Sequence, residues 1–173
     1  KGFVEIIKLL LAHDGVDANQ TIPDSGITPL YTACFNGNID IIKLLLAHNG
    51  IDANQATSQG GVTPLYVACS KGFVEMVKLL LAHGGIDANQ ARTDTGATSL
   101  YMACQGGQAA IIKLLLAHDG INANQARTDT GATPLYSAVF SGVPFAMQYL
   151  VVYGSSLVIE DIQGNTPAQL ATL

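Results

Sequence analysis

The sequence predicts an all-α solenoid of stacked antiparallel helix pairs with protruding β-hairpin-like fingers. Thr-Pro-Leu-Tyr begins at Thr28, Thr63 and Thr133, with the variant Thr-Ser-Leu-Tyr at Thr98, at steps of 35 residues. A glycine recurs at the same step from Gly2 to Gly142, and Lys-Leu-Leu-Leu-Ala-His begins at Lys8, Lys43, Lys78 and Lys113. Self-similarity at a fixed period of roughly 20–50 residues is the signature of a repeat architecture.

The composition supports a continuous core that is built by stacking. The chain has 173 residues, of which 49% are hydrophobic and 12% are charged. Chains below about 40 residues bury too little surface to be stable alone, so a 35-residue unit needs its neighbours. The length predicts one domain over residues 1–173.

The charge pattern argues against two classes of partner. The net charge is −5, and the lysines are spread along the repeats instead of being clustered. Binding to a phosphate backbone needs a dense basic surface, so we expect no nucleic-acid partner. Lysine interrupts every apolar helix pattern, and no apolar run approaches the ~18 residues of a membrane span, so we expect no membrane partner.

Each repeat is predicted to hold two short helices. Thr28 is a good N-cap and Pro29 suits the first helical position, where its missing N–H costs nothing. Gly37 ends this first helix in a left-handed conformation. A second helix opens at Asn38 or Ile39 and closes at His48 and Gly50, with a buried stripe of isoleucines and leucines at helical spacing.

A polar connector follows each second helix, and a glycine precedes each threonine cap. Asp-Ala-Asn-Gln recurs from Asp52 and Asp87, and Gly26, Gly61, Gly96 and Gly131 precede the caps. Glycine supplies the positive φ that a tight turn needs, so a hairpin-like finger is expected here. The recurring asparagine can donate and accept at once, and we expect it to bridge backbone groups of neighbouring fingers.

These motifs together resemble the ankyrin repeat. The pattern is Gly-x-Thr-Pro-Leu-Tyr-x-Ala-Cys, a glycine, and then Leu-Leu-Leu-Ala-His-x-Gly-x-Asp-Ala-Asn, and it covers essentially the whole chain. The family's usual histidine after Thr-Pro-Leu is replaced by tyrosine, and the period is 35 instead of 33 residues. The resemblance implies an ankyrin-repeat α-solenoid that binds another protein and is not an enzyme.

The period also predicts the repeat boundaries. Lys1–Glu5 repeats the sequence of Lys71–Glu75, so the chain is expected to begin within a repeat, at a cut. We expect a partial repeat over 1–22, repeats over 23–57, 58–92, 93–127 and 128–160, and a truncated repeat over 161–173.

Neither the cysteines nor the histidines are predicted to form a chemical site. Cys34, Cys69 and Cys104 share one repeat position, as do His13, His48, His83 and His118. Packed helices lie about 10 Å apart, too far for a disulfide or a shared zinc ion. The cysteines are expected to be small buried residues, and the histidines to bond helix-terminal carbonyls. We therefore expect no catalytic residue, no cofactor and no metal site, and the free thiols favour a cytoplasmic location.

Binding is predicted at the positions that vary between repeats, on the finger tips and the first helix. These surfaces form the family's concave groove, and aromatic side chains dominate binding energy. The alternative for the tyrosines is that they are packing residues. The predicted partner-binding residues are Tyr31, Phe35, Asn36, Tyr66, Ser70, Lys71, Asp94, Thr95, Tyr101, Gln105, Asp129, Thr130, Tyr136 and Phe140.

Three hypotheses of function remain open from the sequence. The first is a monomeric module that binds a partner protein of unknown identity. The second is a structural spacer within a longer protein, with no dedicated partner on this segment. The third, an enzyme, would need a catalytic domain outside these residues.

Overall fold

The structure is a computed structural model that describes residues 2–13 and 15–171. Lys1, Thr172 and Leu173, which fall in the predicted end repeats, lie outside the described residues, as does Asp14. The chain divides into two compact units, Lys1–Asp87 and Ala88–Leu173, here called unit 1 and unit 2.

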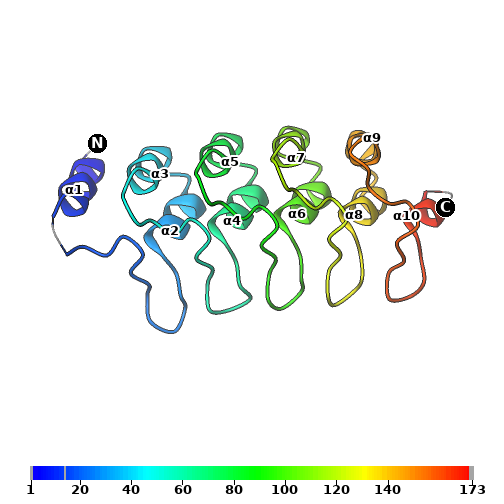
Figure 1. Ribbon diagram of the computed structural model, residues 1–173, viewed down its shortest axis with the longest axis horizontal. Coiled ribbons are helices and arrows are strands. Elements are labelled where there is room, and N and C mark those ends of the chain that lie inside the picture. Colours follow the sequence, from blue (N-terminus) through cyan, green and yellow to red (C-terminus); the bar gives the residue numbers. More distant parts are fainter. Residues whose placement is uncertain (1, 14, 172–173) are drawn as a thin grey trace. The chain divides into compact units, whose positions relative to one another are not determined.

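Unit 1 contains helices in two rows (Figure 1). Its second helices are α1 (Gly2–Leu11), α3 (Ile39–Leu46) and α5 (Val74–Leu81), and its first helices are α2 (Pro29–Asn36) and α4 (Pro64–Lys71). First helix α2 packs on α4, and each of them packs on the second helix that follows it. The stacked antiparallel pairs of the sequence prediction are therefore present.

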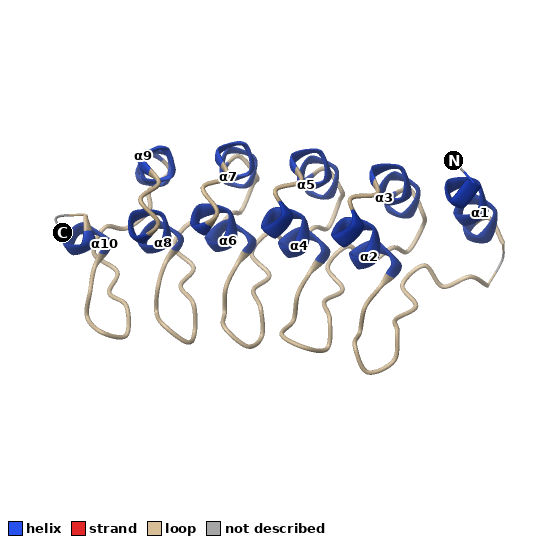
Figure 2. Cartoon of the chain, turned by 180° about the vertical axis from the view of Figure 1, so that it is seen from behind, coloured by secondary structure: helices blue, strands red, loops and turns tan. Residues whose placement is uncertain are grey.

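Unit 2 is built in the same way (Figure 2). Its first helices are α6 (Ser99–Gln105), α8 (Pro134–Phe140) and α10 (Pro167–Leu170), and its second helices are α7 (Ala109–Leu116) and α9 (Pro144–Val152). Helix α8 packs on α6, α9 and α10, and α7 packs on α6 and α9. In each unit, loops extend from the first-helix row on the side away from the second helices.

The first helices begin and end as the sequence predicts. The Thr28 hydroxyl oxygen accepts a hydrogen bond from the Tyr31 backbone N–H at 3.0 Å, and Thr63, Thr98, Thr133 and Thr166 cap their helices in the same way. Gly37 closes α2 with φ of 78°, a conformation that only glycine adopts readily. The second helices end at Leu46, Leu81 and Leu116, two residues before the histidines that were expected to close them.

The fingers are hairpin-like turns, and none of the described residues forms a named strand. Ile22 and Ile27 make an isolated antiparallel bridge. The same closure is made by backbone bonds from Thr57 to Val62, Arg92 to Ala97 and Arg127 to Ala132. Consecutive fingers are joined within each unit by single backbone bonds, from Ser58 N–H to Ser25 C=O at 2.9 Å and from Thr128 N–H to Thr95 C=O at 3.0 Å.

The finger asparagines bridge backbone groups of consecutive repeats, but these groups lie in the turn after the next second helix and not in the next finger as predicted. The Asn54 side chain donates to the Gly85 carbonyl and accepts from the Asp87 N–H, both at 2.8 Å. Asn19 and Asn89 make the equivalent pair of bonds, each to backbone groups of the repeat that follows it. Asn124 donates to the Gly154 carbonyl and accepts from the Ser156 N–H. The bonded groups lie in the turn that follows the next second helix. One amide thus satisfies a donor and an acceptor that belong to the neighbouring repeat.

Candidate functional site

A pocket in unit 2 brings together residues from the fingers and the first helices. Its volume is about 270 Å³, and we call it the finger–helix pocket. Of the sequence-predicted residues it gathers Tyr101, Gln105, Thr130, Tyr136 and Phe140. Its remaining lining residues are Ala132, Ser137, Ser141, Asp161, Ile162 and Gln163.

Helix geometry explains why these side chains meet. Tyr101 and Gln105 lie one turn apart on α6, and Tyr136 and Phe140 lie one turn apart on α8, so each pair shares a helix face. Thr130 comes from the finger that precedes α8, and Ile162 and Gln163 come from the loop that precedes α10. Phe140 is 78% exposed and Ile162 is 70% exposed. The pocket therefore has a mixed polar and apolar lining, in which the two apolar side chains Phe140 and Ile162 are open to solvent.

Arg127 links the finger before α8 to the tyrosine of α6. Its guanidinium carbon lies 5.2 Å from the centre of the Tyr101 ring, and its Nε donates to the Asp129 carboxylate at 2.8 Å. Hydrogen bonding to Asp129 raises the pKa of Arg127, and the guanidinium holds the pKa of Asp129 below its usual range. The finger tip therefore carries both charges, already paired with each other.

Hydrogen bonds hold Asp161, which lines the finger–helix pocket, in place. A bond from the Tyr136 hydroxyl to the Asp161 carboxylate raises the pKa of Tyr136. Desolvation acts to raise the pKa of Asp161, but bonds from the Asn165 N–H, the Tyr136 hydroxyl and the Gln163 N–H outweigh it and lower the pKa. The tyrosine that replaces the family's histidine thus binds the loop of the next repeat.

Unit 1 holds a second group of predicted residues on its first helices. The Tyr31 and Phe35 rings stack with centres 6.4 Å apart and an angle of 15° between their planes. The Lys71 ammonium lies 4.2 Å from the centre of the Phe35 ring, a distance at which a cation is attracted to the ring face. Phe35 is 48% exposed. Asn36, the residue after Phe35, and Ser70, the residue before Lys71, are also exposed.

The other predicted residues fall into two groups. Tyr66 is 5% exposed and Tyr101 is 7% exposed, so most of each ring is covered. Asp94 and Asp129 are exposed on identical finger tips, and Thr95 is partly exposed beside the first of them. Arg92 pairs with Asp94 as Arg127 pairs with Asp129, and this bond lowers the pKa of Asp94 to about 2.

Sequence reasoning did not select Asp161, Ile162 and Gln163 as site residues. The last step between threonine caps, from Thr133 to Thr166, is 33 instead of 35 residues, which hid the correspondence. Aligning the repeats on their threonine caps would have revealed the equivalent positions. Ile162 and Gln163 stand before the cap Thr166 at the same distances as Asp129 and Thr130 stand before the cap Thr133.

The cysteines behave as predicted, whereas the histidines differ. All three cysteines are buried and outside disulfides, and desolvation raises the pKa of Cys34 and of Cys104 to about 12. Such thiols are poor nucleophiles because the reactive thiolate is disfavoured. The Nδ1 atoms of His48, His83 and His118 are buried without a hydrogen-bond partner, so they do not bond helix-terminal carbonyls as expected. Backbone N–H groups bond the last carbonyls of these helices instead. In α3, for example, the Ala47 N–H donates to the Lys43 carbonyl and the His48 N–H donates to the Leu45 carbonyl.

The described part of the chain has neither a metal-binding cluster nor a membrane-spanning helix. Within residues 2–13 and 15–171, no group of three or more His, Cys, Asp or Glu side chains is placed to hold a metal ion. Over the same residues, no helix has the length and apolar character to cross a membrane.

Comparison with known proteins agrees with this architecture. The family model described as ankyrin repeats (3 copies) matches residues 1–92, 51–127 and 85–161. No curated protein matched the sequence. Among solved structures, the chain is similar to the ankyrin repeat domain of Bcl-3, described as a unique member of the IkappaB protein family. That match has a TM-score of 0.86 and 25% sequence identity, and it covers 98% of this chain and 73% of the other.

Proposed function

The chain belongs to the ankyrin-repeat family, and we propose that it binds a partner protein through its finger tips and first helices, with the finger–helix pocket of unit 2 as the centre of the contact. Ankyrin repeats are generally protein–protein interaction modules. The partner and the binding surface of this chain are the parts that we propose.

The observation that carries the proposal is the grouping of solvent-open apolar side chains with polar groups around one pocket. Phe140 and Ile162, 78% and 70% exposed, flank a lining of hydroxyl, amide and carboxylate groups. Binding energy in protein interfaces is concentrated in a few aromatic and apolar anchors within a polar rim. We assign the anchor role to Phe140 and Ile162, and the rim role to Gln105, Thr130 and Gln163.

The remaining predicted residues take secondary roles in this proposal. Phe35 and Lys71 would offer a second apolar and cationic contact on unit 1, with Asn36 and Ser70 beside them. Asp94, Thr95 and Asp129 would contribute polar finger-tip contacts. Tyr66 and Tyr101 have little exposed area, so we assign them to supporting the first helices, together with Tyr31 and Tyr136.

We also propose that the free chain is a non-catalytic monomer in a reducing, cytoplasmic setting. The three buried cysteines, none of them in a disulfide, support the location, because thiols persist in reducing compartments. The raised pKa values of Cys34 and Cys104 support a structural role instead of a nucleophilic one.

A matched pair of exposed residues tests the binding proposal. Phe140→Ala removes an exposed side chain of the pocket, whereas Val152→Ala removes one that is 77% exposed on α9 and lies outside the pocket. Quantitative affinity purification would compare the proteins recovered by each variant. We expect specific partners to fall by about fivefold or more with Phe140→Ala, since an anchor contributes more than ~1 kcal/mol, and to be retained with Val152→Ala.

Equal recovery by the wild-type chain, Phe140→Ala and Ile162→Asp would contradict the proposal. That outcome favours the alternative function, a structural spacer, in which this surface has no dedicated partner.

A further inference from the structure

Two asparagine–glycine pairs occur in the chain, Asn36-Gly37 and Asn49-Gly50, and both lie in unit 1. Asparagine is one of the thermolabile residue types. In such a pair the backbone nitrogen of the glycine can attack the side-chain carbonyl carbon of the asparagine, because glycine has no Cβ to hinder the approach. Both asparagine side chains are exposed to solvent. Residue types and exposure are therefore matched, and a difference in reactivity has to come from the backbone.

The backbone of the first pair is held in place. Asn36 is the last residue of α2, and the Gly37 N–H donates to the Ala33 carbonyl. A Cβ at Gly37 would lie 3.4 Å from the Phe73 ring of the next repeat, so that repeat confines this glycine as well. The Gly37 nitrogen can attack the Asn36 side chain only after it leaves its hydrogen bond and the end of α2 unwinds. The fold therefore protects this pair.

The second pair lies in an open turn after α3, which ends at Leu46. Within the described part of the chain, the Gly50 N–H has no hydrogen-bond acceptor and the Asn49 side chain has no hydrogen-bond partner. A Cβ at Gly50 would meet no atom within 4 Å. The Gly50 nitrogen can therefore turn toward the Asn49 side chain without first breaking a hydrogen bond of its own.

We propose that Asn49 is a site of spontaneous deamidation, and that its isoaspartate product releases the hydrogen bonds that Asn19 makes to this turn. The Gly50 nitrogen forms a bond to the Asn49 side-chain carbonyl carbon, and the side-chain amide leaves as ammonia with the proton of that nitrogen. Water then opens the cyclic imide at either carbonyl, which gives aspartate or isoaspartate. One water is consumed and one ammonia is released, with no oxidant or reductant, and either product carries a carboxylate in place of the neutral amide.

The aspartate product is compatible with the fold. Asp119 stands before Gly120 as Asn49 stands before Gly50, one pair of repeats further along the chain. There the Asn89 side chain donates to the Gly120 carbonyl at 2.8 Å and accepts from the Asn122 N–H at 2.7 Å. An aspartate at this position therefore permits the bridge from the preceding repeat.

The isoaspartate product changes the main chain next to the bridge. Its backbone runs through the former side chain and gains one atom before Gly50. The Asn19 side chain donates to the Gly50 carbonyl and accepts from the Asp52 N–H, both at 2.8 Å. These two groups directly follow the altered bond, so the added atom displaces them relative to α3. Asn19 then cannot meet both at once.

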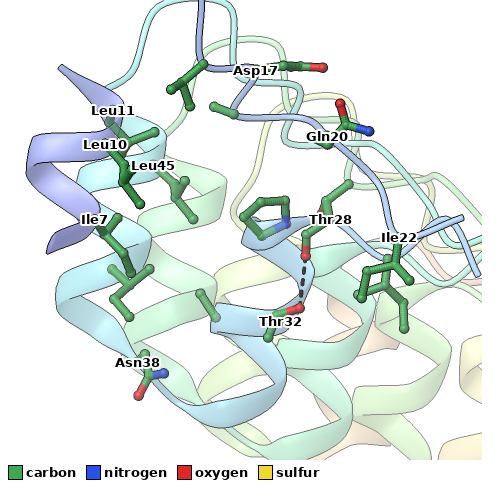
Figure 3. Close-up of a pocket in the computed structure, with 16 residues that line it drawn as sticks. Ile7, Leu10, Leu11, Asp17, Gln20, Ile22, Thr28, Thr32, Asn38 and Leu45 are labelled. Atoms are coloured by element: carbon green, nitrogen blue, oxygen red, sulfur yellow. Dashed lines mark hydrogen bonds between the residues drawn. The ribbon is translucent and has the colours of Figure 1, made fainter. Parts of the chain in front are cut away.

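The Asn19 bridge also anchors the connector that precedes the first finger. The Asn19 N–H donates to the Asp17 carboxylate at 2.9 Å. Asp17 and Gln20, on either side of Asn19 in the sequence, line the pocket between α1, α2 and α3 (Figure 3). Loss of the bridge therefore loosens the connector between α1 and α2, whereas the aspartate product leaves it in place.

Ageing of the whole chain tests the site. The purified chain is incubated at physiological temperature and mildly alkaline pH, and tryptic peptides are followed by mass spectrometry. Trypsin cuts after Lys43, so the two pairs fall in different peptides. We expect Asn49 to deamidate at least about tenfold faster than Asn36, because reaction at Asn36 first costs the Gly37 hydrogen bond and the last turn of α2. In urea, where both backbones are open, the two rates should converge.

Two variants separate the effects of the products. Asn49→Asp reproduces the aspartate product, and Asn49→Gly removes the reactive side chain and reproduces Gly84 of the next repeat, where Asn54 still donates to the Gly85 carbonyl at 2.8 Å. Hydrogen exchange of the Asp52 N–H reports the bridge. Its protection should fall by about threefold or more in the isoaspartate fraction of the aged wild-type chain. It should stay unchanged in Asn49→Asp and in aged Asn49→Gly.

Three outcomes would overturn the proposal. One is equal deamidation of Asn49 and Asn36 in the folded chain, which would show that the backbone does not set their reactivity. Another is an unreactive Asn49 in the folded chain when both pairs react in urea. The third is unchanged protection of the Asp52 N–H in the isoaspartate fraction, which would show that the added atom does not disturb the Asn19 bridge.

Discussion

At the scale of single residues, the finger asparagines hold consecutive repeats together within each unit. The amide of Asn54 uses its donor on the Gly85 carbonyl and its acceptor on the Asp87 N–H. An apolar side chain, or one that has only a donor or only an acceptor, cannot replace both bonds. The same residue type recurs at the same place because the same two backbone groups recur there.

The first prediction concerns Asn54→Ala. Loss of both bonds should lower the free energy of unfolding by about 1–3 kcal/mol, because each net hydrogen bond contributes ~0.5–1.5 kcal/mol. Urea denaturation followed by circular dichroism measures the change. Gln55→Ala, at the next residue, should stay within about 0.5 kcal/mol of the wild type, and an equal loss in both variants would contradict the bridging role.

The second prediction concerns the charge pair on the finger tip of unit 2. Arg92 holds the pKa of Asp94 at about 2, below its ordinary value of 3.8. A lowered folded-state pKa stabilises the fold above the ordinary value, and this contribution is lost as the pH falls from about 4 through about 2. NMR titration of the Asp94 carboxyl should give a midpoint near 2, and Arg92→Gln should move it toward 3.8.

The identical finger provides the control for this titration. Arg127→Gln should raise the pKa of Asp129 and leave that of Asp94 unchanged, since each arginine pairs with the aspartate two residues on. A midpoint for Asp94 that does not respond to Arg92→Gln would show that another group sets it.

At the scale of elements, the first helices share one construction, with one departure. Four of them begin with a threonine cap and proline, at Pro29, Pro64, Pro134 and Pro167. Helix α6 has Ser99 in place of proline. Its cap, Thr98, has φ of −89° and ψ of 167°, a conformation that a following proline permits.

The third prediction follows from this departure. Ser99→Pro should raise the free energy of unfolding by about 0.4–1 kcal/mol, because proline reduces the freedom of the unfolded chain where the folded backbone already suits it. Thermal or urea denaturation measures the gain. Ser99→Ala is the control, because it removes the buried hydroxyl without adding the proline ring. A loss of stability with Ser99→Pro but not with Ser99→Ala would show that the backbone at the start of α6 does not accept proline.

At the scale of the whole molecule, each unit has a core in which first and second helices meet. Leu65 and Leu80 of unit 1 are 1% and 0% exposed, and Leu100 and Leu115 of unit 2 are both 0% exposed. A single helix pair is too small to cover its own apolar stripe, so stability depends on the neighbouring repeat. A defect in one buried leucine therefore weakens the interface with the repeat beside it as well.

The fourth prediction compares two leucines of unit 1. Leu65→Ala should lower the free energy of unfolding by about 2–5 kcal/mol through lost burial and a residual cavity. Leu9→Ala, at a side chain that is 73% exposed, should cost under about 0.5 kcal/mol. Urea denaturation measures both, and similar costs would contradict the assignment of the core.

Most of the fold could be predicted because its determinants are local. The threonine caps, Pro29 and Gly37 act within one turn of chain, and the asparagine bridges repeat with the period. The binding residues were less predictable. Their grouping into a pocket depends on Ile162 and Gln163, which follow an irregular repeat, and the single domain over residues 1–173 stays a prediction. The predicted bonds to helix-terminal carbonyls are not made by the Nδ1 atoms of His48, His83 and His118, which are buried without hydrogen-bond partners.

The helix pairs, the fingers and the family could be predicted from the sequence, because caps, turns and a fixed period act through neighbouring residues. Which copies of a repeated residue face solvent depends on tertiary packing. Leu81 and Leu116 occupy the same repeat position, but Leu81 is partly exposed and Leu116 is only 3% exposed. The physical reason is that burial belongs to the space around a side chain, which the packed helices beside it set and which a repeated motif does not encode.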